Sequence, residues 1–111
     1  MQRILIVLAV SLALAAWTTT APTQGYRPPG STAPPWQIYG ELFDFTNVKI
    51  YIDGVKVVDE RLSLLSGDGE FRGRYGGKAI SASCSTTSGL LSSSVRCIVF
   101  VDNERAATLS F

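Results

Sequence analysis

The sequence predicts an all-β domain, a small antiparallel meander of about six strands that closes as a barrel or folds as a sandwich. Apolar and polar residues alternate around two-residue turns in the second half of the chain, as half-buried strands require. The two cysteines predict one disulfide in so small a chain. No window after residue 20 shows the 3.6-residue apolar period of a helix.

Residues 1–16 have the layout of an export signal. Arg3 supplies positive charge, residues 4–16 are apolar apart from Ser11, and small residues close the segment. These thirteen residues are too few to span a bilayer comfortably, because a spanning helix needs about 20. We therefore expect an exported protein, located in the periplasm or at the envelope membrane.

The end of this segment resembles a bacterial lipoprotein signal. It reads Leu14-Ala15-Ala16-Trp17 before a Thr-rich stretch, whereas the family has a lipid-bearing cysteine at the last position. Because indole offers no thiol, the lipidation position is lost at Trp17. Three interpretations stay open: an ordinary signal cleaved after Ala15, an uncleaved segment that holds the protein loosely on the membrane, and a lipoprotein in which Trp17 is a sequence variant.

Residues 17–35 are expected to form a tether between the signal and the domain. All five prolines of the chain lie in this stretch, together with glycine, threonine and serine. Such a composition favours an extended or disordered chain. The composition changes at Trp36, so we place a single β domain at residues 36–111.

The first hairpin of that domain is expected to turn at an Asp-Gly pair. Its register places Ile52 opposite Val55. One step further, Ile50 faces Val57, and all four apolar residues share one face.

A second hairpin turns at Gly76-Gly77. This turn places Gly73 opposite Ile80, and Phe71 opposite Ala82.

Cys84 and Cys97 are expected to form the disulfide between adjacent strands. Twelve residues lie between them, so the closed loop stabilises the fold by roughly 3 kcal/mol on the chain-entropy model. A slip of one residue would turn Ser81 and Ser83 into the core. The cysteine register instead pairs small and apolar residues at the inward positions, Ala82 with Val99 and Ile80 with Val101.

A third turn is expected at Asp102-Asn103, because asparagine tolerates a left-handed backbone. Residues 101–106 resemble residues 52–57. Two interpretations stay open, similar turn chemistry and a duplicated half-domain.

The residue inventory argues against an enzyme. The chain has no histidine, and bridged cysteines supply no thiolate. Asp53 and Asp102 lie in turns, and Asp68 and Glu70 supply two carboxylates where calcium takes six or more oxygens. We therefore expect no catalytic residue, no cofactor and no metal.

The charge distribution disfavours nucleic acid as a partner. Residues 36–111 carry eight basic and nine acidic side chains, and both signs are interspersed. Nucleic-acid binding wants a clustered basic face instead.

The loop closed by the disulfide is the first candidate interaction site. Its tip is Gly89-Leu90-Leu91, flanked by serines and threonines. A clamped loop loses less entropy on docking, which favours a recognition tip. Alternatively, the two leucines fold back and plug the open end of a barrel.

The outward face of the central strands is the second candidate. The expected register forms one row from Arg72, Ser81 and Phe100, and the next row adds Ile98 beside Ser83 and Glu70. Arg72, Ile98 and Phe100 are candidate interaction residues of a shallow docking surface. Alternatively, this face is covered by the apolar side chains of residues 36–43.

These features predict a non-enzymatic module of the cell envelope that binds a protein or a cell-wall component, with membrane association through the N-terminal segment. One alternative is an inhibitor of an envelope-acting enzyme such as a lysozyme. The small lipoprotein lysozyme inhibitors are similar in size, β content and cysteine use, a similarity of architecture alone. Another alternative is a subunit of a secretion or envelope complex.

The lipoprotein resemblance predicts that Trp17→Cys suffices for acylation in a bacterial host. The variant should incorporate labelled fatty acid and move to the membrane fraction, while the unchanged chain incorporates none. Several acyl chains give stable anchoring, whereas one gives only marginal binding. Export of the variant without acylation would show that the resemblance at residues 14–17 is accidental.

Overall fold

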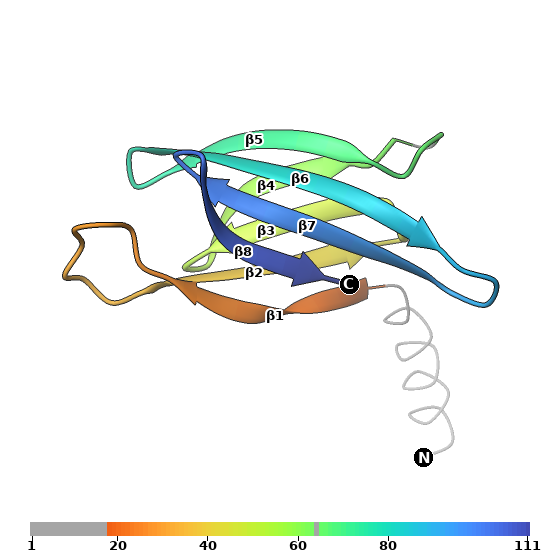
Figure 1. Cartoon of the computed structure of the whole chain (residues 1–111), viewed down its shortest axis with the longest axis horizontal. Helices are drawn as coiled ribbons and strands as arrows, with labels where there is room; N and C mark the ends of the chain where they lie inside the picture. Colours follow the sequence, from red (N-terminus) through yellow and green to blue (C-terminus); the bar gives the residue numbers. More distant parts are fainter. Residues whose placement is uncertain (1–17, 64) are drawn as a thin grey trace, which may run out of the picture.

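A computed structural model describes residues 18–63 and 65–111, so the predicted signal and Trp17 lie outside the described residues. The described chain folds into eight β-strands (Figure 1). None of its residues belongs to a helix suited to crossing a membrane. The strands are β1 (Thr18–Tyr26), β2 (Trp36–Phe43), β3 (Asn47–Ile52), β4 (Val55–Arg61), β5 (Gly69–Tyr75), β6 (Lys78–Ser88), β7 (Ser93–Val101) and β8 (Glu104–Ser110).

The strands form two four-stranded antiparallel sheets, with orders β1-β2-β3-β4 and β5-β6-β7-β8. One sheet lies behind the other in Figure 1. The predicted all-β, antiparallel class and the disulfide are confirmed. The number of strands is eight rather than about six, and the strands do not close into one barrel.

One hydrophobic core joins the two sheets. Its members come from both of them, and no polar or charged residue of the described chain is buried with them. Burying apolar side chains in this way stabilises the fold by about 1.5–3 kcal/mol for each large one. The fully buried large side chains are Ile38, Val48, Ile50, Ile52, Ile80, Val99, Val101 and Leu109.

The register predicted around the disulfide is confirmed. Cys84 lies opposite Cys97, with an S–S distance of 2.04 Å. The predicted inward and cross-hairpin pairs of the second sheet are all found: Ala82–Val99, Ile80–Val101, Gly73–Ile80 and Phe71–Ala82.

The first predicted hairpin is only half right. Ile52 pairs with Val55 as predicted, but Ile50 pairs with Val58 because a β-bulge shifts the register at Val57. Val58 therefore takes the buried position, and Val55 is 51% exposed. The four residues do not share one inward face.

The structure differs from the tether predicted for residues 17–35. Residues 18–26 form β1, which pairs with β2, and Ala21 and Tyr26 are buried in the core. Pro22 fits because β1 is the outer strand of its sheet and a register shift follows Ala21. The β domain thus begins ahead of Trp36.

Side chains bridge the gap between β1 and β8, which belong to different sheets. The Gln24 amide donates to the Thr108 carbonyl oxygen, and the Thr108 amide donates to Gln24 Oε1 at 3.0 Å. The Tyr26 hydroxyl donates to Glu104 Oε1 at 3.0 Å. Gln24 thus supplies the pair of bonds that a neighbouring strand would make.

The gap between β4 and β5 is closed by direct backbone approach. A Cβ at Gly73 would collide with the carbonyl oxygen of Val57, the bulged residue of β4. Glycine is therefore required for β5 to lie this close to β4.

The two sheets repeat one plan. Each has four consecutive antiparallel strands. In each, the pairing of the third strand with the fourth shifts at an equivalent position, between Ile50 and Tyr51 in β3 and between Val99 and Phe100 in β7. The similarity noted between the turns therefore extends through both sheets. The equivalent inward pairs are Ile38–Ile52, Gly40–Ile50 and Leu42–Val48 in the first sheet, and Ile80–Val101, Ala82–Val99 and Cys84–Cys97 in the second.

We expect reduction of the Cys84–Cys97 disulfide to destabilise the protein, because the bridge restricts the unfolded chain. The loss should be about 2–5 kcal/mol in the free energy of unfolding. Chemical denaturation with and without reductant measures it, and Cys84→Ala/Cys97→Ala serves as a variant that reductant cannot affect. Equal stability of the oxidised and reduced protein would contradict this expectation.

Candidate functional site

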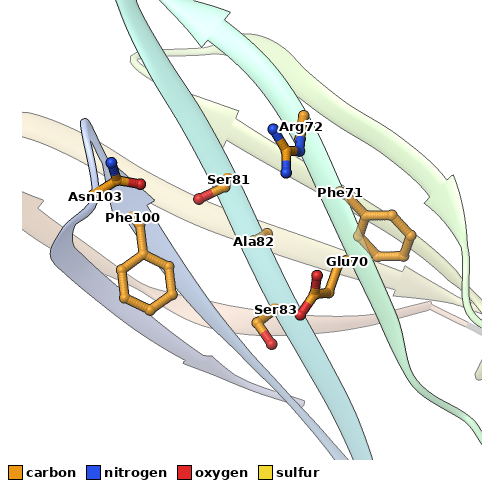
Figure 2. Close-up of a pocket in the computed structure, with 8 residues that line it drawn as sticks. All are labelled: Glu70, Phe71, Arg72, Ser81, Ala82, Ser83, Phe100 and Asn103. Carbon is orange, nitrogen blue, oxygen red and sulfur yellow. The ribbon is translucent and has the colours of Figure 1, made fainter.

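The second sheet presents the two predicted rows on its outward face. Arg72 pairs with Ser81, and Ser81 pairs with Phe100. The second row, Glu70–Ser83–Ile98, also forms as predicted. Figure 2 shows the two serines of β6 between the charged side chains of β5 and the ring of Phe100 on β7.

A hollow of about 280 Å³ lies over these rows on the outward face, and it is lined by the predicted Arg72 and Phe100 but not by Ile98. Its floor is low because β6 contributes only small outward side chains, whereas both neighbouring strands contribute long ones. Asn103, in the turn after β7, completes one end. The hollow is lined by Glu70, Phe71, Arg72, Ser81, Ala82, Ser83, Phe100 and Asn103.

The hollow continues along β6 in both directions. One adjoining hollow, of about 400 Å³, shares Glu70 and Ser83 and adds Asp68 and Ser85. The other, of about 360 Å³, shares Arg72, Ser81 and Asn103 and adds Arg74. We call this row of three adjoining hollows the serine trench, with Ser81, Ser83 and Ser85 as its floor and Glu70, Arg72 and Phe100 as its walls.

The equivalent face of the first sheet has no such floor of serines. Tyr39 occupies the position equivalent to Ser81, and its ring stacks on Tyr51 with centroids 5.0 Å apart. Burial, followed by a hydrogen bond to Glu41, raises the pKa of Tyr51. The two sheets share one backbone plan, yet one outward face is filled and the other is hollow. The trench therefore results from the side chains at these positions and not from the fold.

The alternative that residues 36–43 cover this face is wrong. That segment is β2, an inner strand of the first sheet, with Ile38 and Leu42 buried in the core. Trp36 packs against Tyr26 and Tyr75, with ring centroids 6.1 Å and 4.9 Å apart. The core accommodates these side chains between the sheets, so they are not available to cover the trench.

Charge changes sign along the trench. Asp68, which precedes β5, and Glu70 lie toward one end of the wall, and Arg72 and Arg74 lie toward the other. Residues 18–63 and 65–111 contain no group of three histidine, cysteine, aspartate or glutamate side chains placed to hold a metal ion. A ligand with both donor and acceptor groups along its length would match this wall.

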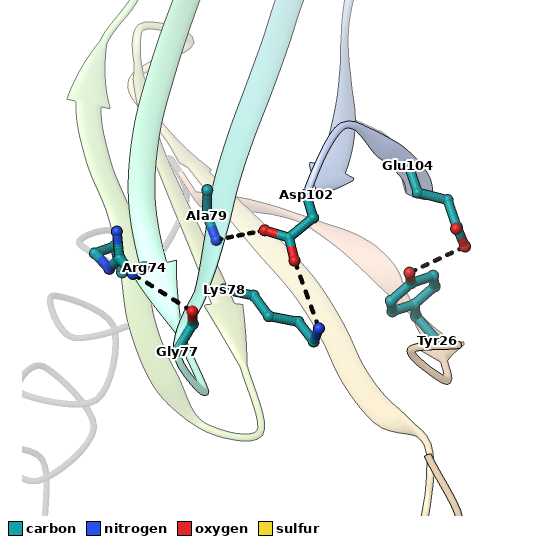
Figure 3. A network of polar contacts seen from close by, with 7 residues as sticks. All are labelled: Tyr26, Arg74, Gly77, Lys78, Ala79, Asp102 and Glu104. Atoms are coloured by element: carbon teal, nitrogen blue, oxygen red, sulfur yellow. Dashed lines mark hydrogen bonds and ion pairs between the residues drawn. The ribbon is translucent and has the colours of Figure 1, made fainter. Parts of the chain in front are cut away.

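The turn aspartates stabilise the hairpins, but their partners lie on neighbouring strands and not within the turns themselves. Asp102 Oδ1 accepts from the Ala79 amide at 3.0 Å, and Lys78 Nζ lies 3.5 Å from Oδ2 (Figure 3). Asp53 Oδ1 likewise accepts from the Gln37 amide at 2.8 Å. These carboxylates belong to equivalent turns of the two sheets, outside the trench.

The second carboxylate oxygen of Asp53 accepts from the Tyr75 hydroxyl at 3.0 Å. This bond raises the pKa of Tyr75, and desolvation adds to the effect. The bond therefore links the first sheet to β5 near one end of the molecule.

The clamped loop is shorter than predicted, and its leucines do not plug the fold. The β6–β7 ladder extends to Ser88 and Ser93, so only residues 89–92 form the connection. Leu90 and Leu91 are 103% and 101% exposed. The plug interpretation is therefore wrong, because the hairpin extends straight out and holds its tip away from the core.

Two features of the surface are absent from the sequence predictions. The sequence predicts only a turn role for Asn103, yet Asn103 also lines the trench. Leu65, which is 101% exposed, lies in the loop between β4 and β5. The sequence does carry a signal for this exposure. Leu65 directly precedes Ser66-Gly67-Asp68, a stretch typical of a solvated turn, so its side chain is expected to lie in water.

No family model, no curated protein and no solved structure matches this chain.

Proposed function

We propose that the protein is a non-enzymatic binding module of the bacterial cell envelope, a β-sandwich that holds a wall polysaccharide chain in its serine trench. The observation that carries this proposal is the open trench on only one of two equivalent sheet faces. The first sheet shows that this fold can fill its outward face with stacked tyrosine rings. The hollow on the second sheet is therefore the place where we expect the ligand to lie.

The lining suits a sugar chain. The ring of Phe100 offers an apolar platform for the C–H face of a pyranose, and serine hydroxyls both donate and accept hydrogen bonds. Asn103 lies near Phe100, and Glu70 and Arg72 face that platform from across β6, so all three supply planar groups that can pair with sugar hydroxyls (Figure 2). Most of the lining is polar, which suits a ligand that carries many hydroxyl groups.

The shape suits a polymer more than a single sugar. The three adjoining hollows follow β6 and share lining residues, so they accommodate an extended chain. The wall is acidic toward one end and basic toward the other. Arg72 and Arg74 can therefore pair with the carboxylates of a wall polymer, and Asp68 and Glu70 can accept from its acetamido N–H groups.

The arrangement favours binding without catalysis. Cleavage of a glycosidic bond generally uses two carboxylates on opposite sides of the bond. Here Asp68 and Glu70 lie on the same wall, and Phe100 and Ile98 on the opposite strand carry no ionisable group. The expected signal of residues 1–16 supports an envelope location.

The proposal predicts that Ser81→Tyr abolishes binding to purified peptidoglycan sacculi in a sedimentation assay. The new ring copies Tyr39 of the first sheet and fills the trench without touching the core. Phe100→Ala removes the platform and should weaken binding about tenfold or more, as loss of a buried aromatic anchor does.

Tyr51→Ala is the matched control, because Tyr51 is the equivalent of Phe100 on the first sheet. It should bind sacculi as well as the unchanged protein does. Undiminished binding of the folded Ser81→Tyr variant would refute the trench as the site.

A second candidate, an inhibitor of a lysozyme-like enzyme, is favoured by the clamped hairpin that exposes Leu90 and Leu91. A preorganised apolar tip loses little entropy on entering a cleft. In this case the protein slows lysis of a cell-wall suspension by lysozyme, and Leu90→Ser/Leu91→Ser removes that effect. Lysis at an unchanged rate in the presence of excess protein argues against this candidate.

A further inference from the structure

We infer that one end of the molecule, where β1 begins, rests on a lipid surface. This end carries the β2–β3, β4–β5 and β6–β7 connections, because the strands run alternately up and down. Figure 1 shows these connections together with the start of β1 and the C-terminus. We call it the apolar end, and the inference does not depend on the ligand of the serine trench.

Exposed apolar side chains concentrate at this end. Five large apolar residues of the described chain are more than half exposed, and four of them lie in its three connections. Phe45 is 58% exposed, and Leu65, Leu90 and Leu91 are fully exposed. These four side chains, carried by three loops at one end of the molecule, form the surface on which the inference rests.

The opposite end shows what ordinary connections look like in this protein. Its tight turns are Asp53-Gly54, Gly76-Gly77 and Asp102-Asn103, and hydrogen bonds and an ion pair tie them to neighbouring strands. Figure 3 shows these contacts for the last two turns. Val55, next to the first of these turns, is the fifth exposed apolar residue. The polarity of the two ends therefore differs within one fold.

The apolar tips are held in place by the scaffold. The disulfide and the ladder up to Ser88–Ser93 support Leu90 and Leu91. The Thr86 hydroxyl donates to the Gly67 carbonyl oxygen at 2.5 Å, which attaches the β4–β5 loop to β6. Rigid support keeps these side chains in water unless a partner covers them.

A hollow of about 240 Å³ lies at the same end. Its apolar wall consists of Leu42, Phe45, Val95 and Phe111, and Thr19 of β1 lies beside it. The apolar lining therefore extends from Phe45, in the β2–β3 connection, to the start of the chain's first strand.

The chain itself indicates what covers this surface. Thr18 pairs with Phe43, which directly precedes the β2–β3 turn, so the chain enters the domain at the apolar end. The apolar residues 4–16 stand immediately before that point. A membrane-inserted segment of this length would bring the apolar end to the bilayer interface, where leucine side chains gain from leaving water.

Acidic and basic side chains are mixed around the apolar end, so it is not specialised for anionic lipid. Asp44, Glu60 and Asp68 carry negative charge near the three connections, and Arg61 and Arg96 carry positive charge. Because this end has no excess of basic side chains, association should not require anionic lipid.

The test places the full chain in phosphatidylcholine nanodiscs that contain lipids with gadolinium-chelating headgroups. Amide NMR signals of residues 65 and 89–92 should be broadened by the paramagnetic headgroups. Signals of residues 53–54, 76–77 and 102–103, at the opposite end, should stay sharp. Equal broadening at both ends, or no association with the nanodiscs, would overturn the inference.

A triple variant, Leu65→Ser/Leu90→Ser/Leu91→Ser, separates lipid contact from mere proximity. It should lose the loop broadening and bind phosphatidylcholine vesicles about tenfold more weakly, since three leucines no longer enter the interface. Its thermal unfolding should be unchanged because these side chains are exposed in the fold.

Val55→Ser removes an exposed apolar side chain at the opposite end and should behave as the unchanged protein does. Full broadening in the triple variant would overturn the inference. The inference would also be overturned if the loop signals did not change with nanodiscs but shifted on addition of lysozyme. That result would assign the loop tips to a protein partner.

Discussion

The alternation of side chains along β6 is the constraint on which the core and the trench both depend. Ile80, Ala82 and Cys84 face the core, so the residues between them, Ser81 and Ser83, must face outward. A slip of one residue would bury hydroxyls and expose apolar side chains. The disulfide to β7 fixes this register, and it therefore sets the floor of the trench as well as the packing of the core.

The two sheets show how one backbone plan can carry different surfaces. Strand order, inward pairing and the position of the bulge agree between them. On the outward faces, Tyr39 and Tyr51 stack in one sheet, whereas the equivalent pair in the other is Ser81 and Phe100. The floor of the trench has Ser81, Ser83 and Ser85 where the first sheet has Tyr39, Glu41 and Phe43, while the inward pairs keep the same plan.

Local patterns predicted the second sheet well, because its turns are short and its inward residues alternate strictly. The pairing of Cys84 with Cys97 and the row across Ser81 follow from these patterns alone. Long-range effects decided the rest. The proline-containing segment forms β1 because Ala21 and Tyr26 gain from burial in the core. The close approach of β5 to Val57 occurs at a β-bulge, and the alternation of apolar and polar residues does not reveal a bulge. The exposure of Leu90 depends on how far the ladder extends, which composition does not determine.

The gaps between the sheets have a consequence for self-association. Unpaired strand edges invite pairing with another copy, and this hazard grows when molecules are confined to a surface at high local concentration. Here β1 lies beside β8, where Gln24 occupies the hydrogen-bonding groups of Thr108, and β4 lies beside β5 at Gly73. Each edge is shielded by the other sheet of the same molecule, so crowding should leave the protein monomeric instead of joining copies into a continuous sheet.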